Sequence, residues 1–182
     1  MGTRSDTCVL LSGGVDSAVV LAMIADRSPT AVWVYYGQPS AAAERKASKA
    51  LAGLYAVPWS TVQISGLNPP AAGVFPARND LLVAAARTAA GGSSVAVGVH
   101  AGTGYADCSP VWATAWQSLL DAQDGGRTGL IAPLLELTKA DVLRLARDLA
   151  VPLAITHSCE ASSVPCGRCS SCMDRRGVDA LA

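Results

Sequence analysis

A short string of glycine, serine and aspartate follows the first apolar run of the chain and could bind phosphate. It reads Ser12-Gly13-Gly14-Val15-Asp16-Ser17. Glycines let backbone N–H groups turn inward around an anion, and the N-terminus of a following helix adds its positive dipole end. Ser17 adds a hydroxyl group, and Asp16 could hold a magnesium ion or orient a phosphate. The string has no Walker A lysine, which argues against a kinase or a GTPase. A turn that binds nothing is the simpler alternative.

Four cysteines near the C-terminal end could bind a metal ion. Cys159, Cys166, Cys169 and Cys172 follow the spacing C-x6-C-x2-C-x2-C. Four soft thiolates this close in sequence suit tetrahedral zinc, and an iron–sulfur cluster is the chemical rival. A zinc ion with four sulfur ligands has no open position for catalysis. The sequence therefore predicts a structural zinc site whose binding energy helps to fold the tail.

Alternating strand and helix patterns must position these two motifs. Short apolar runs predict strands at Cys8–Leu11, Ala31–Tyr36, Thr61–Ile64, Val95–Val99 and Leu130–Ala132. Helices are predicted at Ala18–Ala25, Ser40–Leu54, Leu81–Ala90 and Pro110–Asp124, and a further one after Thr138, where Thr138 and Asp141 resemble a capping box. This alternation favours an α/β fold with a doubly wound parallel sheet that helices cover on both faces.

Length and composition indicate one compact domain. The chain has 182 residues, of which 51% are hydrophobic and 15% charged, and its formal net charge is zero. We predict a single domain over 1–182 that includes the metal-binding tail at 156–176. Zero net charge argues against a nucleic-acid partner, and neither a secretory signal nor an apolar stretch of the ~20 residues of a membrane span is visible. The expected location is cytoplasmic, where clustered cysteines favour metal over disulfides.

The glycine loop and the cysteine tail together resemble the 7-cyano-7-deazaguanine synthase (QueC) family of PP-loop ATP pyrophosphatases, which cleave ATP between the α and β phosphates. The resemblance extends over nearly the whole chain and implies a fold of the adenine nucleotide alpha hydrolase-like (HUP) type with a C-terminal zinc-binding segment. The segments that carry it are Val9–Val20, Tyr36–Gln38, Pro76–Asn79, Gly104–Cys108, Pro133–Leu134, Leu137–Lys139, Thr156–Cys159, Pro165–Cys169 and Cys172.

The resemblance implies an ATP-dependent carbon–nitrogen ligase. ATP would adenylate the carboxylate of 7-carboxy-7-deazaguanine, ammonia would displace AMP to form an amide, and a second ATP would activate the amide oxygen for elimination to the nitrile. ATP, Mg²⁺ and a structural Zn²⁺ are the implied cofactors. The implied partners are the small-molecule acid and ammonia, with no membrane and no nucleic acid, and a homodimer is compatible with this scheme.

The same resemblance assigns roles to individual residues. His157 stands where the family usually has an aromatic residue and is expected to pack beside the metal. His100 carries no family motif, but from its place at a strand end it could face the site. Asp16, Ser17 and Lys139 would be catalytic, with Lys139 as the cation for the phosphates. Nucleotide binding would involve Leu11, Ser12, Gly13, Gly14, Val15, Asp16, Ser17, Tyr36 and Gln38, and substrate binding Arg78, Asn79, Tyr105 and Asp107, of which Asp107 would accept hydrogen bonds from the amino-pyrimidinone edge.

Four positions depart from the family pattern and leave alternatives open. They are Pro39, Ser40, Ser109 and Val111, where the family usually has polar or charged residues. A related enzyme could adenylate another carboxylate, or join a deazapurine to another acceptor such as a protein. A tRNA-thiolating enzyme or an amidotransferase-like ligase is a second class, although the neutral chain shows no basic surface. A non-catalytic module that binds zinc and a nucleotide is a third.

Overall fold

The computed structural model describes residues 6–70 and 73–179, with side chains as far as Arg176. Its centre is a five-stranded sheet in which every pair of neighbouring strands is parallel, in the order β3-β2-β1-β4-β5. The predicted parallel α/β architecture is therefore confirmed. The strands are β1 (Thr7–Leu10), β2 (Thr30–Tyr35), β3 (Trp59–Gln63), β4 (Ser94–Ala96) and β5 (Leu130–Ile131).

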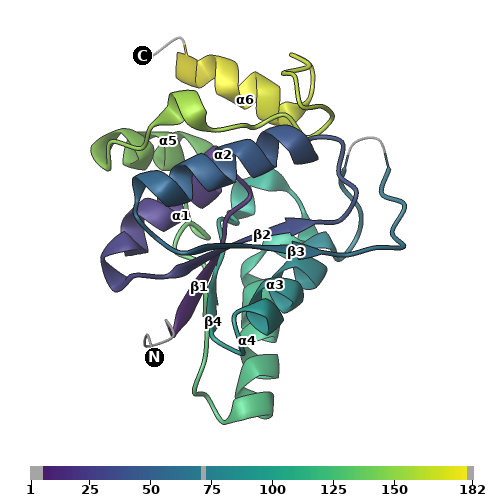
Figure 1. The fold of residues 1–182 in the computed structure, drawn as a ribbon, viewed down its shortest axis with the longest axis vertical. Helices are drawn as coiled ribbons and strands as arrows, with labels where there is room; N and C mark the ends of the chain where they lie inside the picture. The colour runs from purple at the N-terminus through teal and green to yellow at the C-terminus, as the bar shows by residue number, and fades with distance from the viewer. Residues whose placement is uncertain (1–5, 71–72, 180–182) are drawn as a thin grey trace.

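Helices cover both faces of this sheet (Figure 1). In a strand, successive side chains point to opposite faces, so Val9 and Leu11 enter one core cluster while Cys8 and Leu10 enter the other. The first face is covered by α1 (Val15–Ile24), α2 (Ala41–Leu54) and α5 (Lys139–Asp148), and the second by α3 (Arg78–Ala89) and α4 (Pro110–Asp124).

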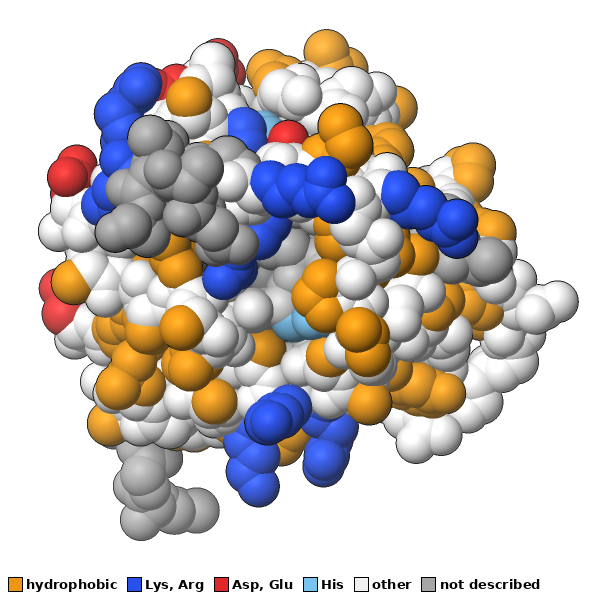
Figure 2. All heavy atoms as spheres, turned by 90° about the horizontal axis from the view of Figure 1, so that it is seen from above, with side chains coloured by type: hydrophobic (Ala, Val, Ile, Leu, Met, Phe, Trp, Pro, Cys, Tyr) orange, Lys and Arg blue, Asp and Glu red, His pale blue; other side chains and the backbone are white. Residues whose placement is uncertain are grey.

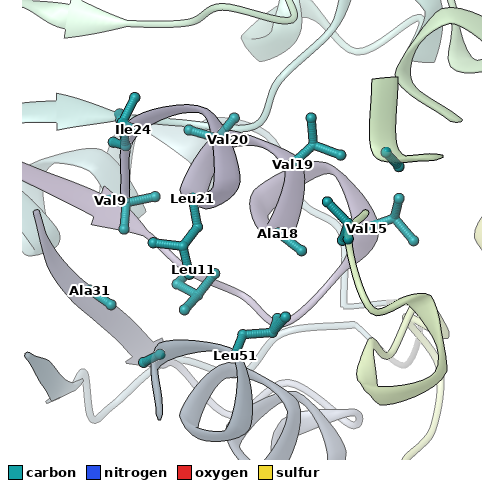
Figure 3. Packing of buried hydrophobic residues seen from close by; sticks show 14 of the residues in the cluster. Val9, Leu11, Val15, Ala18, Val19, Val20, Leu21, Ile24, Ala31 and Leu51 are labelled. Atoms are coloured by element: carbon teal, nitrogen blue, oxygen red, sulfur yellow. The ribbon is translucent and has the colours of Figure 1, made fainter. Parts of the chain in front are cut away.

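Helix α1 is buried almost all round, because it is enclosed between β1, α2 and α5. Val15, Ala18 and Val19 of α1 pack with Leu11 of the sheet and Leu51 of α2 in the first cluster (Figure 3). The residues that begin α1 are thus held from several sides. This matters for function because those residues belong to the glycine loop.

Local sequence signals set the starts of α4 and α5. Thr138 and Asp141 form the predicted capping box at the start of α5. Pro110 is the first residue of α4, and the Ser109 hydroxyl accepts a hydrogen bond from the Trp112 N–H. Helix α3 begins at Arg78, three residues before the predicted start at Leu81.

One helix lies outside the predictions. Helix α6 (Ser170–Asp179) begins between two cysteines of the metal-binding motif, in a stretch without an apolar stripe. The Met173 N–H donates to the Cys169 carbonyl, so the first turn of α6 is part of the cysteine cluster. None of the described helices is long and apolar enough to cross a membrane.

The strand order creates a crevice between β1 and β4. The chain builds β1, β2 and β3 in one direction across the sheet and then returns to place β4 and β5 on the other side of β1. In open α/β sheets, ligands bind at the carboxyl ends of the strands where the order reverses. The glycine loop follows β1 directly, so it lies at this point.

Candidate active site and metal centre

A cavity of about 430 Å³ lies at the carboxyl ends of β1, β2 and β4. The first residues of α1, α3 and α5 form part of its wall, and the tail after Thr156 and α6 close another side. Seen from above in Figure 2, lysine and arginine side chains surround a hollow in which a histidine is visible. Among the predicted site residues, those lining the cavity are Ser12, Gly14, Val15, Asp16, Ser17, Tyr36, Gln38, Arg78, Asn79, Tyr105, Lys139 and Cys159.

The glycine loop needs glycine because other backbone elements approach it closely. Gly13 has a φ of +90°, and a Cβ there would lie 2.7 Å from the Glu44 carbonyl oxygen of α2. A Cβ on Gly98, just after β4, would lie 2.8 Å from the backbone nitrogen of Ser17. The start of α1 is therefore packed against α2 on one side and against the end of β4 on the other.

Two serine hydroxyl groups form hydrogen bonds within the turn of the glycine loop. The Ser17 Oγ donates to the Gly14 carbonyl at 3.0 Å and lies 3.1 Å from the Ser12 Oγ. The Ser12 Oγ accepts the Gly14 N–H at 3.3 Å. The backbone around these residues is thereby held at the positive end of the α1 dipole, which suits an anion such as a phosphate group.

Lys139 and Asp16 meet at the rim of the loop. The Lys139 Nζ, on the first residue of α5, lies 2.6 Å from the Asp16 Oδ1. The His100 Nε2, just beyond β4, lies 3.8 Å from the Asp16 Oδ2. Burial lowers the pKa of His100 below its usual 6.5, and the nearby Asp16 carboxylate opposes that shift. The imidazole is therefore neutral near pH 7, and the lysine is the cation beside the loop.

Gln38 lines the cavity, but its amide is engaged within the protein. Its Nε2 donates to the Val34 carbonyl at 3.0 Å and to the Glu44 Oε2 at 2.9 Å, while its Oε1 accepts the Tyr36 N–H at 2.9 Å. The buried Tyr36 hydroxyl donates to the Gly73 carbonyl at 3.3 Å. Desolvation raises the pKa of Tyr36 to about 12, so this phenol stays protonated. Gln38 and Tyr36 thus form a part of the cavity wall that internal hydrogen bonds hold in place.

The four predicted substrate residues divide into two groups. Arg78, Asn79 and Tyr105 line the cavity, whereas Asp107 does not. The Asp107 carboxylate accepts the Asn79 backbone N–H at 3.0 Å, and the Asn79 side chain donates to the Asp107 carbonyl at 3.0 Å. Asp107 therefore connects the loop before α4 to the first turn of α3.

Two predicted nucleotide-loop residues, Leu11 and Gly13, also lie outside the cavity lining, and Leu11 is fully buried in the core.

The four cysteine sulfurs converge at one point. The Sγ atoms of Cys159, Cys166, Cys169 and Cys172 all lie within 4.8 Å of one another. Backbone N–H groups also point at the sulfurs: the Cys169 N–H donates to the Cys166 Sγ and the Cys172 N–H to the Cys169 Sγ, both at 3.4 Å. N–H groups from Arg168 and Cys169 lower the pKa of the Cys166 thiol to about 6. Such a set of thiols can hold a metal ion.

His157 connects the cysteine cluster to the glycine loop. Its backbone N–H donates to the Gly13 carbonyl at 2.8 Å. Its Nε2 lies 3.1 Å from the Cys159 carbonyl oxygen and 2.9 Å from that of Ser162, so this nitrogen carries the proton and donates to them. The cysteine-containing tail is consequently in direct contact with the glycine loop.

Other cavity residues carry no motif that sequence reasoning could have used. Glu160 follows Cys159 directly, and Ser171 and Asp174 come from the unexpected helix α6. Arg175 of α6 also lines the cavity and donates to the Leu153 carbonyl at 2.6 Å. Their positions depend on how the tail folds back over the sheet.

The four positions that depart from the family pattern do not border the candidate site. None of Pro39, Ser40, Ser109 and Val111 is among the described residues that line the cavity. Ser40 is buried and its Oγ donates to the Glu44 Oε1 at 2.6 Å, Ser109 caps α4, and Val111 is 79% exposed.

The structure defines a parallel α/β protein of the HUP type with a glycine-rich loop at the switch point of its sheet and a four-cysteine tail. An NMN synthetase from Francisella tularensis has a similar fold, with a TM-score of 0.59 at 20% identity, covering 96% of this chain and 73% of that one. This likeness concerns the fold alone.

Sequence comparison gives the family. Residues 6–73 and 68–180 match the family described as queuosine biosynthesis protein QueC. The chain is 36% identical to the 7-cyano-7-deazaguanine synthase of Methylococcus capsulatus over 92% of this chain and 91% of that protein. It is 34% identical to the synthase of Azoarcus sp. over 92% of this chain and 89% of that protein. The chain belongs to the QueC family of queuosine biosynthesis proteins.

Proposed function

We propose that this chain is an ATP-dependent ligase that converts 7-carboxy-7-deazaguanine and ammonia to 7-cyano-7-deazaguanine. The observation that carries the proposal is the Lys139–Asp16 contact of 2.6 Å at the rim of the glycine loop. It joins the first turns of α1 and α5, so one lysine and two helix N-termini converge beside the cavity. Such a convergence of positive charge suits a triphosphate undergoing α–β cleavage.

The first half of the reaction forms an amide. A carboxylate oxygen of the acid attacks the α-phosphorus of ATP, and pyrophosphate leaves. Backbone N–H groups at the start of α1 and the Lys139 ammonium stabilise the charge that develops on the phosphate oxygens. Ammonia then attacks the acyl carbon, and AMP leaves with the original carboxylate oxygen.

The second half converts the amide to the nitrile in the same site. The amide oxygen attacks the α-phosphorus of a second ATP, and pyrophosphate leaves again. Loss of the remaining N–H protons and departure of AMP with the amide oxygen form the C≡N bond. The neutral His100 imidazole lies beside Asp16 and can accept one of these protons.

Magnesium is the implied partner of the nucleotide. Asp16 is the carboxylate that fits it, because this side chain lines the cavity and is about one quarter exposed. Its Oδ1 pairs with Lys139, while its Oδ2 has, among the described residues, an ion-pair neighbour only in His100 at 3.8 Å. When bound, the ion would neutralise charge on the phosphate oxygens.

Zinc is the metal that fits the four cysteines. Four sulfurs at about 2.3 Å from one zinc ion lie about 3.8 Å apart in a regular tetrahedron, and the Cys166 and Cys172 Sγ atoms are 4.0 Å apart. In an iron–sulfur cube each thiolate binds a different iron, which spreads the sulfurs further. A closed site of four sulfurs would hold the tail against the glycine loop.

Oxygen labelling tests the reaction. The protein is incubated with Mg-ATP, ammonium and the acid carrying two ¹⁸O atoms in its carboxylate, and products are analysed by mass spectrometry. The proposal expects the nitrile and two labelled AMP molecules for each nitrile, each with one ¹⁸O. An enzyme that stops at an amide or joins the acid to another acceptor would give one labelled AMP. Unchanged acid with folded, zinc-loaded protein would contradict the proposal.

A further inference from the structure

Four carboxylates are among the described residues that line the cavity, and they differ in what already binds them. The Asp16 carboxylate pairs with Lys139. Both oxygens of Glu44 accept hydrogen bonds, one from Gln38 and one from Ser40. The remaining two are Glu160 in the tail, whose carboxylate accepts a hydrogen bond from the Ser171 side chain, and Asp174 on α6. Asp107 is outside the lining and is committed to the start of α3.

Glu160 lies in a wall built by three other parts of the chain. A Cβ on Gly73 would be 3.2 Å from the Glu160 carbonyl oxygen, and the Tyr36 hydroxyl donates to the Gly73 carbonyl. The guanidinium of Arg78 interacts electrostatically with Glu160 and also with the hydroxyl of Tyr36. Glu160, Arg78 and Tyr36 thus form one electrostatically linked group in the cavity wall.

Arg78 has unused hydrogen-bonding capacity in this group. Its Nε is buried and has no hydrogen-bond partner among the described residues. A buried donor without a partner is costly, so the position is suited to a ligand that supplies an acceptor. Glu160 lines the same cavity and interacts electrostatically with Arg78, and its carboxylate has lone pairs left after the Ser171 hydrogen bond to accept from N–H donors of the same ligand.

An amino-pyrimidinone edge has the complementary chemistry. It presents a carbonyl oxygen as acceptor next to a ring N–H and an exocyclic amine, which are both donors. A cation and a carboxylate side by side satisfy all three groups, in the same way that arginine and acidic side chains recognise base edges. We propose that Glu160 accepts the ring N–H and amine of the substrate while Arg78 donates to its carbonyl oxygen. This inference rests on the proposed function and replaces Asp107 as the expected acceptor.

Asp174 is a weaker candidate for this role. It is exposed, and it acts electrostatically on both His100 and Glu160. An exposed carboxylate stays hydrated, so it gains less from a hydrogen bond to the heterocycle than the half-buried Glu160 does. Glu160, which shares its wall with two tyrosines and Arg78, is placed for the heterocycle.

The test compares two acids that differ by one amino group. kcat/KM for AMP formation is measured with 7-carboxy-7-deazaguanine and with its analogue that lacks the exocyclic amine, for the wild type, Glu160→Gln and Glu136→Gln. Glu136 is an exposed glutamate outside the cavity lining, so it provides the same chemical change as a control. Asp107→Asn is included because Asp107 is the competing acceptor.

The proposal expects the wild type to favour the amine-bearing acid by about 100-fold or more. In Glu160→Gln this preference should fall by at least about tenfold, mainly through KM, with kcat changed by less than about threefold. Glu136→Gln and Asp107→Asn should keep the wild-type preference. Metal content and thermal melting verify that each variant is folded.

Two results would overturn the inference without touching the proposed function. The first is a wild type that turns over both acids equally well. The second is a folded Glu160→Gln in which both acids lose the same factor, or neither loses any. If Glu160→Gln does not fold, Glu160→Asp takes its place. Its preference for the amine-bearing acid, compared with that of the wild type, then decides whether the side chain at position 160 sets this preference. By contrast, a wild type that forms no AMP with either acid contradicts the proposed function itself.

Discussion

The Lys139 Nζ lies 2.6 Å from the Asp16 Oδ1, although 123 residues separate the two in the chain. Asp16 is in the first turn of α1, and Lys139 is the first residue of α5. The ion pair therefore holds two helix N-termini together beside the cavity. The ion pair fixes the long side chain of Lys139 before the nucleotide binds. The ammonium group would therefore already lie beside the site of the triphosphate.

Removing either member of this pair should abolish catalysis and leave the fold intact. For Asp16→Asn and Lys139→Met we expect AMP formation to fall by about 100-fold or more, since a lost stabilising group in such sites costs that much. The free energy of unfolding should change by about 1 kcal/mol or less, because both side chains are partly exposed. Single-turnover assays and urea unfolding measure the two effects. Lys46→Met, at an exposed position of α2, is the control and should keep wild-type activity. Near-wild-type turnover in Lys139→Met would exclude Lys139 from the reaction.

Two glycine substitutions should have opposite effects on stability. In Gly13→Ala the new Cβ meets α2 backbone at 2.7 Å with φ at +90°, so we expect a loss of about 2–4 kcal/mol. Gly53, inside α2, has nothing within 4 Å of its Cβ position. Gly53→Ala should stabilise by about 0.5–1 kcal/mol. Urea unfolding of both variants measures the difference, and equal effects would contradict the close packing of the loop.

The cysteine cluster should bind one metal ion per chain and stabilise the tail. Cys169→Ser should lose the metal and lower the melting temperature, because binding energy at such a site is folding energy. A chelator should lower the melting temperature of the wild type but not of the variant. Cys8→Ala, at a buried position of β1, should keep full metal content. Elemental analysis decides between zinc and iron, and a metal-loaded Cys169→Ser would remove that residue from the site.

The buried His100 should make stability depend on pH below neutrality. Its pKa lies below 6.5 in the folded protein because of desolvation. The unfolded chain therefore takes up the proton first, and stability falls as pH drops below about 6.5, by up to about 1.4 kcal/mol per pH unit. The loss ends once pH passes the folded pKa. Urea unfolding of the wild type and His100→Gln from pH 8 to pH 5 should show a steeper decline for the wild type. Parallel curves would contradict this.

The sequence predicted those parts of the structure that depend on neighbouring residues. The capping box at Thr138 and Asp141 and the proline that begins α4 were located correctly, since a helix end is decided by hydrogen bonds within one turn. The start of α3 was placed too late, because Ala77 and Arg78 carry no capping signal and the carboxylate of Asp107, from a distant loop, accepts the Asn79 N–H. Helix α6 was missed because it forms around the cysteine cluster without an apolar stripe.

By itself, the sequence determined the parallel α/β class, the glycine loop after the first strand and the four cysteines of the tail. These follow from periodicity and from spacing within short segments. Only the tertiary structure decided that Lys139 meets Asp16, that His100 lies beside them, and that Glu160 lines the cavity whereas Asp107 does not. The reason is that these positions depend on how crossovers return each strand to the sheet and how the tail folds over it. No local pattern of residues encodes such distances across the fold.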